Sequence, residues 1–123
     1  MKPGQHLDKA RRILAGLSKL DPASDALAII DGTLVAGYHL GNAQLHRHGV
    51  TEASIHFNTP SKLEMPVSTL PAAVKPAYDA FAGLEDLRTR YVRSPNAPNE
   101  AAALEAQRLL GTMAICCGMS RAR

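Results

Sequence analysis

The sequence predicts an all-α protein, an up-down four-helix bundle with a long loop between the second and third helices. One observation is a long helical stretch, 21–49, with helix signals at both ends. Another is that apolar residues recur at helical spacing in three further stretches, whereas no stretch alternates convincingly as a strand would. The composition agrees, because 46% of the residues are hydrophobic but only 4% are aromatic, and small residues favour close packing of helices. We expect one domain, 1–123.

The stretch 21–49 is expected to form the longest helix and to organise the others. Asp21 is a suitable N-cap, Pro22 suits the first turn, and Gly49 suits the left-handed residue that ends a helix. The span of roughly 25 helical residues, about 37 Å long, needs partners to be stable. Its expected buried stripe consists of Leu27, Ile30, Leu34, Tyr38 and Leu45, widened by Ile29 and Val35.

The first and third helices have weaker end signals. The first is expected over about 5–19, antiparallel to the long helix because the connecting turn is short. The third begins near Ser68 or Thr69, and Pro76 either separates a short opening turn or kinks the helix. Leu84 lies in the middle of its apolar stripe, so we expect Leu84 to be buried.

The fourth helix follows a break rich in Pro and Asn. It is capped by Asn96 or Asn99 and runs to about 117–118, with a frayed tail over 119–123. Its inward residues are expected to be Ala103, Ala106, Leu110, Met113 and Cys117.

Two features of the middle of the chain bear on its surfaces. The loop over 50–66 is long for so small a bundle, and we expect Ile55, Phe57 and Leu63 to fold it back over the core. Gly37 and Gly41 would allow another backbone to approach closely, either in the same chain or in a second copy. A homodimer is therefore expected, since two-fold dimers are the commonest oligomers.

Charge and cysteine content narrow the class of protein that the sequence can represent. The net charge of +3 permits an anionic partner without requiring one. Cys116 and Cys117 are adjacent, so we expect two reduced thiols, one buried and one nearer the surface. There is no apolar signal segment and no run long enough to span a membrane, which predicts a cytoplasmic protein without membrane contact.

Histidines form one candidate site. His39 and His46 stand seven apart, on one helical face but two turns away from each other, too far to share a metal ion directly. No metal or other cofactor is expected, and no nucleotide-binding or redox motif occurs. His39, His46 and His56 could instead act as acid or base in a composite site between the second helix and the 50–66 loop, if two of them converge with Asp31 or Asp79.

Arginines form the second candidate site, at the end of the third helix. Arg88, Arg90, Tyr91 and Arg93 would suit an anion, because Arg matches phosphate oxygens and Tyr can stack on a base. The alternative is a structural set of salt bridges with Asp21 and Asp25, which an up-down bundle would bring to the same end.

The chain resembles the HEPN superfamily of small four-helix domains. The resemblance lies in the Gly/Ala-rich second helix with Tyr38 and Asn42, a third helix ending in L-R-x-R-Y, and an Ala-rich last helix. Ribonucleases of that superfamily carry Arg, four to six residues, then His near the junction of the last two helices. Here the residue five positions after Arg88 is Arg93, and no histidine occurs after His56. The resemblance thus implies the family's non-catalytic roles, namely nucleotide or nucleic-acid binding, or pairing with a nucleotidyltransferase partner.

These observations favour a non-catalytic binding or interaction module whose arginine-bearing end meets a nucleotide, a nucleic acid or a partner protein. The alternative is an enzyme that uses the composite histidine site.

Overall fold

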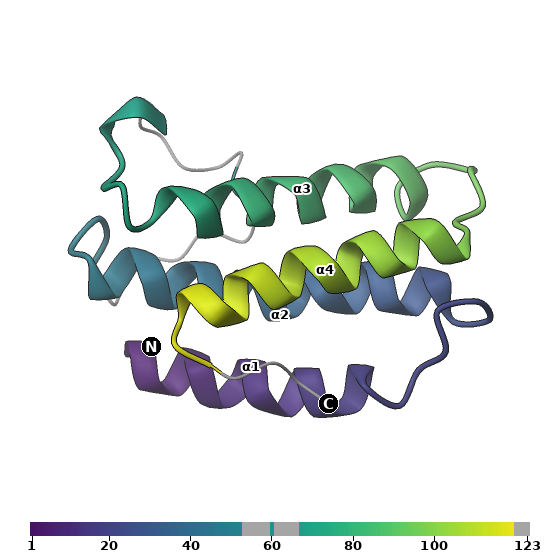
Figure 1. Ribbon diagram of the computed structural model, residues 1–123, viewed down its shortest axis with the longest axis horizontal. Coiled ribbons are helices and arrows are strands. Elements are labelled where there is room, and N and C mark those ends of the chain that lie inside the picture. Colours follow the sequence, from purple (N-terminus) through teal and green to yellow (C-terminus); the bar gives the residue numbers. More distant parts are fainter. Residues whose placement is uncertain (53–59, 61–66, 120–123) are drawn as a thin grey trace.

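The computed structural model describes residues 1–52, 60 and 67–119. It contains four α-helices, α1 (Pro3–Leu17), α2 (Ala26–Arg47), α3 (Lys75–Tyr91) and α4 (Glu100–Cys116), and a short 3-10 helix, η2 (Val67–Thr69). The four α-helices lie side by side and alternate in direction (Figure 1). The predicted up-down four-helix bundle is therefore confirmed. Within the described residues, no helix combines the length and hydropathy needed to cross a bilayer.

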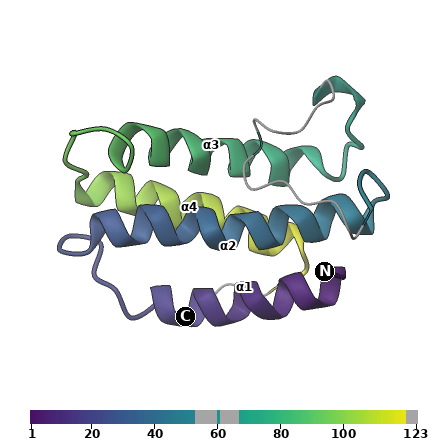
Figure 2. The same ribbon diagram turned by 180° about the vertical axis from the view of Figure 1, so that it is seen from behind.

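The helix α2 is the centre of the bundle. The other three α-helices all pack against it, and α4 packs on α3 as well (Figure 1). Seen from behind, α2 lies in front of α4 and between α1 and α3 (Figure 2). The helix α1 packs mainly on α2. The expectation that one long helix organises the chain is thus met, with α1 attached to its outer side.

The start of α2 differs from the sequence prediction. Asp21 was expected to cap the helix, but the helix begins only at Ala26, and Asp25 is its N-cap. Asp21 and its neighbours bond within the preceding turn instead. The Asp25 carboxylate accepts the Asp21 N–H at 2.8 Å, and the Ser24 hydroxyl donates to Asp21 Oδ2 at 2.8 Å. Such local bonds compete with helix formation, and here they delay it by one turn.

The end of α2 is as predicted. Gly49 has a φ of 71°, a conformation that suits glycine. The Gly49 N–H donates to His46 at 3.2 Å and the Val50 N–H donates to Leu45 at 2.9 Å, so two terminal carbonyls of the helix are satisfied.

The buried face of α2 is also displaced from the expected stripe. Ile29, Ile30 and Leu34 are buried as predicted, but Leu27 is 49% exposed and Val35 is 47% exposed. Leu27 and Val35 share one face of the helix, because eight residues span little more than two turns. The prediction that they are buried was wrong, since the periodic pattern on α2 is broad and does not show which side stays uncovered.

The helix α3 begins at Lys75 and not near Ser68 or Thr69, which lie in η2, whereas α4 begins at one of its predicted caps. The opening piece with Val67–Thr69 is separate from α3, and Pro76 lies in the first turn of α3, so the helix is not kinked there. Of the two candidate caps for α4, Asn99 is the one used, and its side chain accepts the Ala102 N–H at 2.9 Å. The expected inward residues of α4 are all buried, as is Leu84 of α3.

Gly37 and Gly41 lie inside the bundle. A Cβ on Gly37 would come within 3.0 Å of Leu84 and 3.3 Å of Met113, and one on Gly41 would come within 3.0 Å of Phe81. These glycines therefore let α3 and α4 approach α2 in the same chain. The homodimer expected from them stays a prediction, but these residues no longer support it.

The chain around the long loop is partly described. Tyr78 of α3 donates its hydroxyl to the Pro60 carbonyl at 3.1 Å, and Leu45, Leu70 and Val74 form a small second core at this end. Ile55, Phe57 and Leu63 lie outside the described residues. At the other terminus the Met119 N–H donates to Ala114 at 2.9 Å, which ties the start of the expected tail to α4.

Candidate functional site

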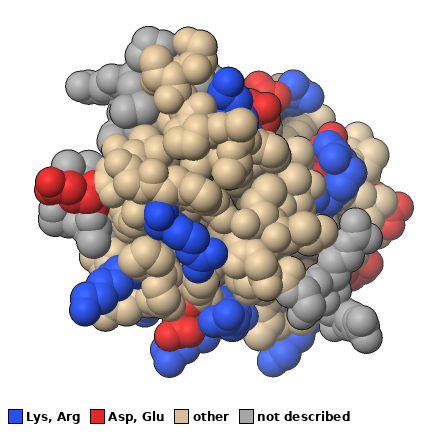
Figure 3. Space-filling view, turned by 60° about the vertical axis from the view of Figure 1, so that its left-hand side comes forward, with Lys and Arg blue, Asp and Glu red and all other residues tan. Residues whose placement is uncertain are grey.

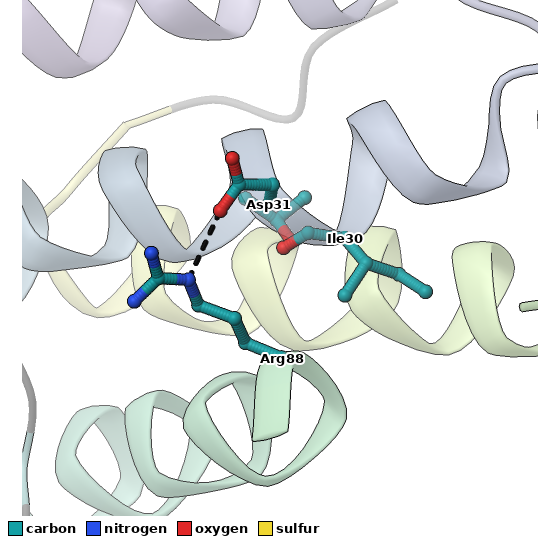
Figure 4. A network of polar contacts seen from close by, with 4 residues as sticks. Ile30, Asp31 and Arg88 are labelled. Atoms are coloured by element: carbon teal, nitrogen blue, oxygen red, sulfur yellow. Dashed lines mark hydrogen bonds and ion pairs between the residues drawn. The ribbon is translucent and has the colours of Figure 1, made fainter. Parts of the chain in front are cut away.

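The first candidate site is the arginine end, defined as Arg88, Arg90, Tyr91 and Arg93. Arg88 reaches from α3 to α2, where its Nε lies 3.0 Å from Asp31 Oδ1, and its two terminal nitrogens point away from that carboxylate (Figure 4). The Arg88 side chain is 31% exposed and that of Asp31 is 49% exposed. Arg88 is therefore held in place without being enclosed.

The other members of the arginine end come from the last turn of α3 and the residues after it. Arg90 pairs with Asp86 of the same helix at 2.7 Å, and both side chains are exposed. Arg93 is exposed and makes no ion pair within the part of the chain that the structure describes, while Tyr91 is half-buried against the core. The structure thus brings these residues to one end of the bundle as predicted.

The salt-bridge partners of these arginines are not the ones that the sequence suggested. Asp21 and Asp25 were considered as their salt-bridge partners, but the pairs that form use Asp31 and Asp86. Asp21 and Asp25 are engaged in the turn before α2 instead. A pair as exposed as Arg88 and Asp31 contributes only about 0–1 kcal/mol to stability.

Charge is not concentrated at the opposite end of the molecule. Figure 3 shows the side where α1 begins and α2 ends, and its Lys and Arg residues are spread among uncharged and acidic ones. On the face shown, the basic residues do not gather into one patch of the kind that a long nucleic acid would need.

The second candidate site is the imidazole cluster, defined as His6, His39 and His46. His6 of α1 is fully buried, and its Nδ1 lies 3.0 Å from Nδ1 of His39 on α2. The ring of His6 is also 5.3 Å from the ring of His46, measured between centroids. The two α2 histidines, which are two turns apart on one face, therefore meet through a third histidine from the neighbouring helix.

The surroundings of the imidazole cluster are aromatic and polar. The ring of Tyr38 stands edge-on to His39, with centroids 4.7 Å apart, and edge-on to His6 at 6.0 Å. His46 bonds through Nδ1 to the Thr51 hydroxyl at 2.9 Å, which fixes the orientation of its ring. The buried Asn42 donates to the Tyr38 carbonyl at 2.7 Å.

The 3.0 Å contact between His6 and His39 has a chemical consequence. Two Nδ1 atoms can form a hydrogen bond only when one carries a proton and the other presents its lone pair. If both rings were cationic, like charges would face each other at an interface where His6 is buried. The pair can therefore share one proton between its nitrogens.

The carboxylates expected beside the histidines are elsewhere. Asp31 pairs with Arg88, and Asp79 is exposed on α3. Neither contacts a histidine in the described part of the chain, so the His–carboxylate arrangement that would favour acid–base catalysis is not assembled there. His56, the third residue of the predicted composite site, lies outside the described residues.

His6 was missed by sequence reasoning. Its signal was present, because His6 stands four and eight residues before Ala10 and Leu14 and thus belongs to the apolar stripe of α1. A histidine in such a stripe is often a core residue with a polar neighbour. The identity of that neighbour depends on how α1 docks against α2, which spacing along a single helix does not reveal.

A third polar contact ties α2 to the end of α4. Gln44, which is buried, donates to the Cys116 carbonyl at 2.5 Å and to Cys117 Sγ at 3.4 Å. Burial raises the pKa of the Cys117 thiol, while the hydrogen bond from Gln44 acts in the opposite direction. Both cysteines are free thiols, Cys117 buried and Cys116 partly exposed, as predicted.

Comparisons with protein-family models, with curated proteins and with solved structures each gave no match. The HEPN resemblance therefore depends on helix pattern and residue placement alone.

Proposed function

We propose that this protein is a non-catalytic helical binding module that takes a nucleotide or single-stranded nucleic acid at its arginine end. The observation that carries the proposal is the state of Arg88. Its Nε is anchored on Asp31 at 3.0 Å, and within the described residues its two terminal nitrogens make no hydrogen bond. An anchored guanidinium with its outer edge available suits the planar, two-point recognition of a phosphate.

The arrangement of the helices supports an anion at this end. The helices α2 and α4 both begin where α3 ends (Figure 1). Helix N-termini carry partial positive charge, so both dipoles add to the charge of the arginines. Tyr91 lies one turn after Arg88, with part of its ring accessible for stacking on a base.

Binding is favoured over catalysis by the placement of the acid–base groups. The alternative enzyme needs a histidine beside a carboxylate, but Asp31 is held by Arg88 instead. The HEPN resemblance points the same way, because the ribonuclease Arg and His pattern is missing from this chain. The non-catalytic roles of that superfamily, including pairing with a nucleotidyltransferase partner, agree with a phosphate-recognising surface.

The test is fluorescence anisotropy with a labelled single-stranded RNA and with labelled ATP. We expect the double variant Arg88→Gln/Arg93→Gln to weaken binding by at least about tenfold. The slope of log K against log salt should fall by about 1.4, because each phosphate contact to a single strand contributes about 0.7. A matched control is Arg11→Gln/Arg12→Gln, which removes the same charge from the exposed face of α1.

Asp31 provides a test of the anchor. Asp31→Ala removes the carboxylate that holds Arg88 Nε, so we expect weaker binding even though the net charge of the protein becomes more positive. Equal loss of affinity in the α1 control and the arginine-end variant would show that binding depends on the net charge and not on the arginine end, and would refute the proposal. Absence of binding to either probe at low salt would refute the proposal.

A further inference from the structure

A separate site is suggested by the imidazole cluster at the interface of α1 and α2. His39 lies eight residues after Asp31 on α2, or about 12 Å along the helix. Its chemistry does not depend on the arginine end, so the two proposals can fail independently. The observations that matter are the 3.0 Å contact between the two Nδ1 atoms and the complete burial of His6.

Two imidazole nitrogens facing each other at this distance are close to the geometry of a shared metal ion. A bond from Zn²⁺ to a histidine nitrogen measures about 2.0–2.1 Å, and two such bonds at the tetrahedral angle place their nitrogens about 3.3 Å apart. The observed 3.0 Å is within a few tenths of an ångström of that value. A cation can replace the shared proton if each ring turns its lone pair off the line that joins the two nitrogens and toward the ion.

We propose that His6 and His39 form a binding site for a divalent transition-metal ion of the class that prefers nitrogen ligands, such as Zn²⁺ or Co²⁺. Both ligands come from packed helices, so the site is largely pre-formed by the docking of α1 on α2. His39 is partly exposed, which gives an ion a path from solvent to a pair whose other member is buried.

The remaining ligands follow from the neighbours of the pair. No group of three His, Cys, Asp or Glu side chains is placed to hold a metal ion among residues 1–52, 60 and 67–119. The described chain thus supplies two nitrogen ligands, and water completes the coordination shell from the side of His39. His46 stands beside His6, but its Nδ1 is engaged by the Thr51 hydroxyl at 2.9 Å, so it would have to move and coordinate through Nε2.

Protons compete with the metal for this site. A neutral histidine must present the coordinating nitrogen without its proton, so a ring with Nδ1–H must first transfer that proton to Nε2, with no net change in charge. An unperturbed histidine takes up a second proton near pH 6.5. Metal affinity should therefore fall as the pH is lowered.

The test is calorimetric titration of the untagged protein with Co²⁺ and with Zn²⁺ at about pH 7.5, where unperturbed histidine is neutral. We expect one ion per chain, and at least tenfold weaker binding in the His39→Gln variant. The matched control is His48→Gln, because His48 is the exposed histidine just after α2 and lies outside the cluster. Circular dichroism of each variant confirms that the helices remain.

A second measurement uses the unaltered protein, so its result does not depend on whether the His39 variant folds. Paramagnetic Co²⁺ should shift or broaden the NMR signals of the His6 and His39 rings at ion concentrations that leave the His48 ring unchanged. Equal affinity of the parent and His39→Gln, a first effect on His48, or no binding of either ion up to millimolar concentration would each overturn the proposal.

Discussion

Leu34 tests the core at the scale of a single residue. It is 3% exposed in the middle of α2, so Leu34→Ala leaves a cavity that the surrounding helices fill only in part. We expect the free energy of unfolding to fall by about 2–5 kcal/mol. Leu27→Ala is the matched control, because Leu27 is on the same helix but is 49% exposed. Its change should stay within about 0.5 kcal/mol in the same urea titration.

The two thiols should differ in reactivity. Cys117 is buried, and burial holds the pKa of its thiol above the usual range, whereas Cys116 is partly exposed. Only the thiolate reacts readily with a disulfide reagent. We therefore expect Ellman's reagent to modify one thiol quickly in the native protein and the second only on unfolding. In Cys116→Ser the fast reaction should disappear, and its persistence would contradict the assignment.

The same thiol should make stability depend on alkaline pH. The folded-state pKa of Cys117 is raised above its unfolded value, so the folded state holds this proton more strongly. Its contribution is fully present below the unfolded pKa of about 8.5 and is lost as the pH rises through the folded value. The free energy of unfolding should therefore decline above about pH 8.5, and decline less in Cys117→Ala.

At the scale of the helices, two glycine substitutions distinguish the effect of side-chain packing on stability from the effect of helix propensity. Gly111 of α4 has nothing within 4 Å of an added Cβ, so Gly111→Ala should stabilise the protein by about 0.5–1 kcal/mol through helix propensity alone. Gly37→Ala gains the same propensity, but its Cβ would press on Leu84, Met113 and Phe81 at 3.0–3.3 Å. We expect Gly37→Ala to destabilise by about 1–3 kcal/mol. Thermal unfolding of both variants measures the contrast.

The cap of α4 is a second test at this scale. Asn99 accepts the Ala102 N–H at 2.9 Å and so satisfies one of the orphan donors of the first turn. Asn99→Ala should cost about 1 kcal/mol of stability. Asn96→Ala, three residues earlier, does not touch the helix start, so the unfolding midpoint should respond to it less than to Asn99→Ala.

Helices could be predicted from the sequence where local chemistry decides their ends. Gly49 and Asn99 mark ends that the structure confirms, because a left-handed residue and an amide acceptor act within one turn. The predicted N-cap at Asp21 was wrong for a local reason too, because Asp21 bonds with Ser24 and Asp25 in the turn before the helix. Leu27 and Val35 were misplaced because burial depends on which face of α2 the other helices cover, and periodicity does not contain that information.

At the scale of the whole molecule, the candidate sites were harder to predict than the fold. The arginine end could be predicted, because its members are adjacent in sequence and come from one helix end. Its partner Asp31 could not, since that contact joins α2 and α3 across 57 residues. The imidazole cluster likewise depends on His6, which lies 33 residues from His39. Long-range pairs of this kind follow from helix docking rather than from spacing.

The unequal packing of the four helices leads to an expectation for the molecule as a whole. The helix α1 packs mainly on α2, whereas α2, α3 and α4 pack on one another. Its buried residues are few, namely His6, Leu7 and Ala10. A helix that packs mainly on one neighbour can detach while the rest stays folded, because the contacts among α2, α3 and α4 do not depend on it.

We therefore expect amide hydrogens of α1 to exchange through a partial opening of lower free energy than those of α2 and α4. Native-state exchange followed by NMR at increasing low urea concentrations measures both the energy and the surface exposed. The α1 amides should show a small urea dependence, and the α2 amides around Leu34 should show the full dependence of global unfolding. If Co²⁺ bridges His6 and His39 as proposed, it should slow exchange in α1 more than elsewhere, since the ion joins the two helices that the opening separates. Equal exchange energies for α1 and α2 without metal would show that the bundle unfolds as one unit.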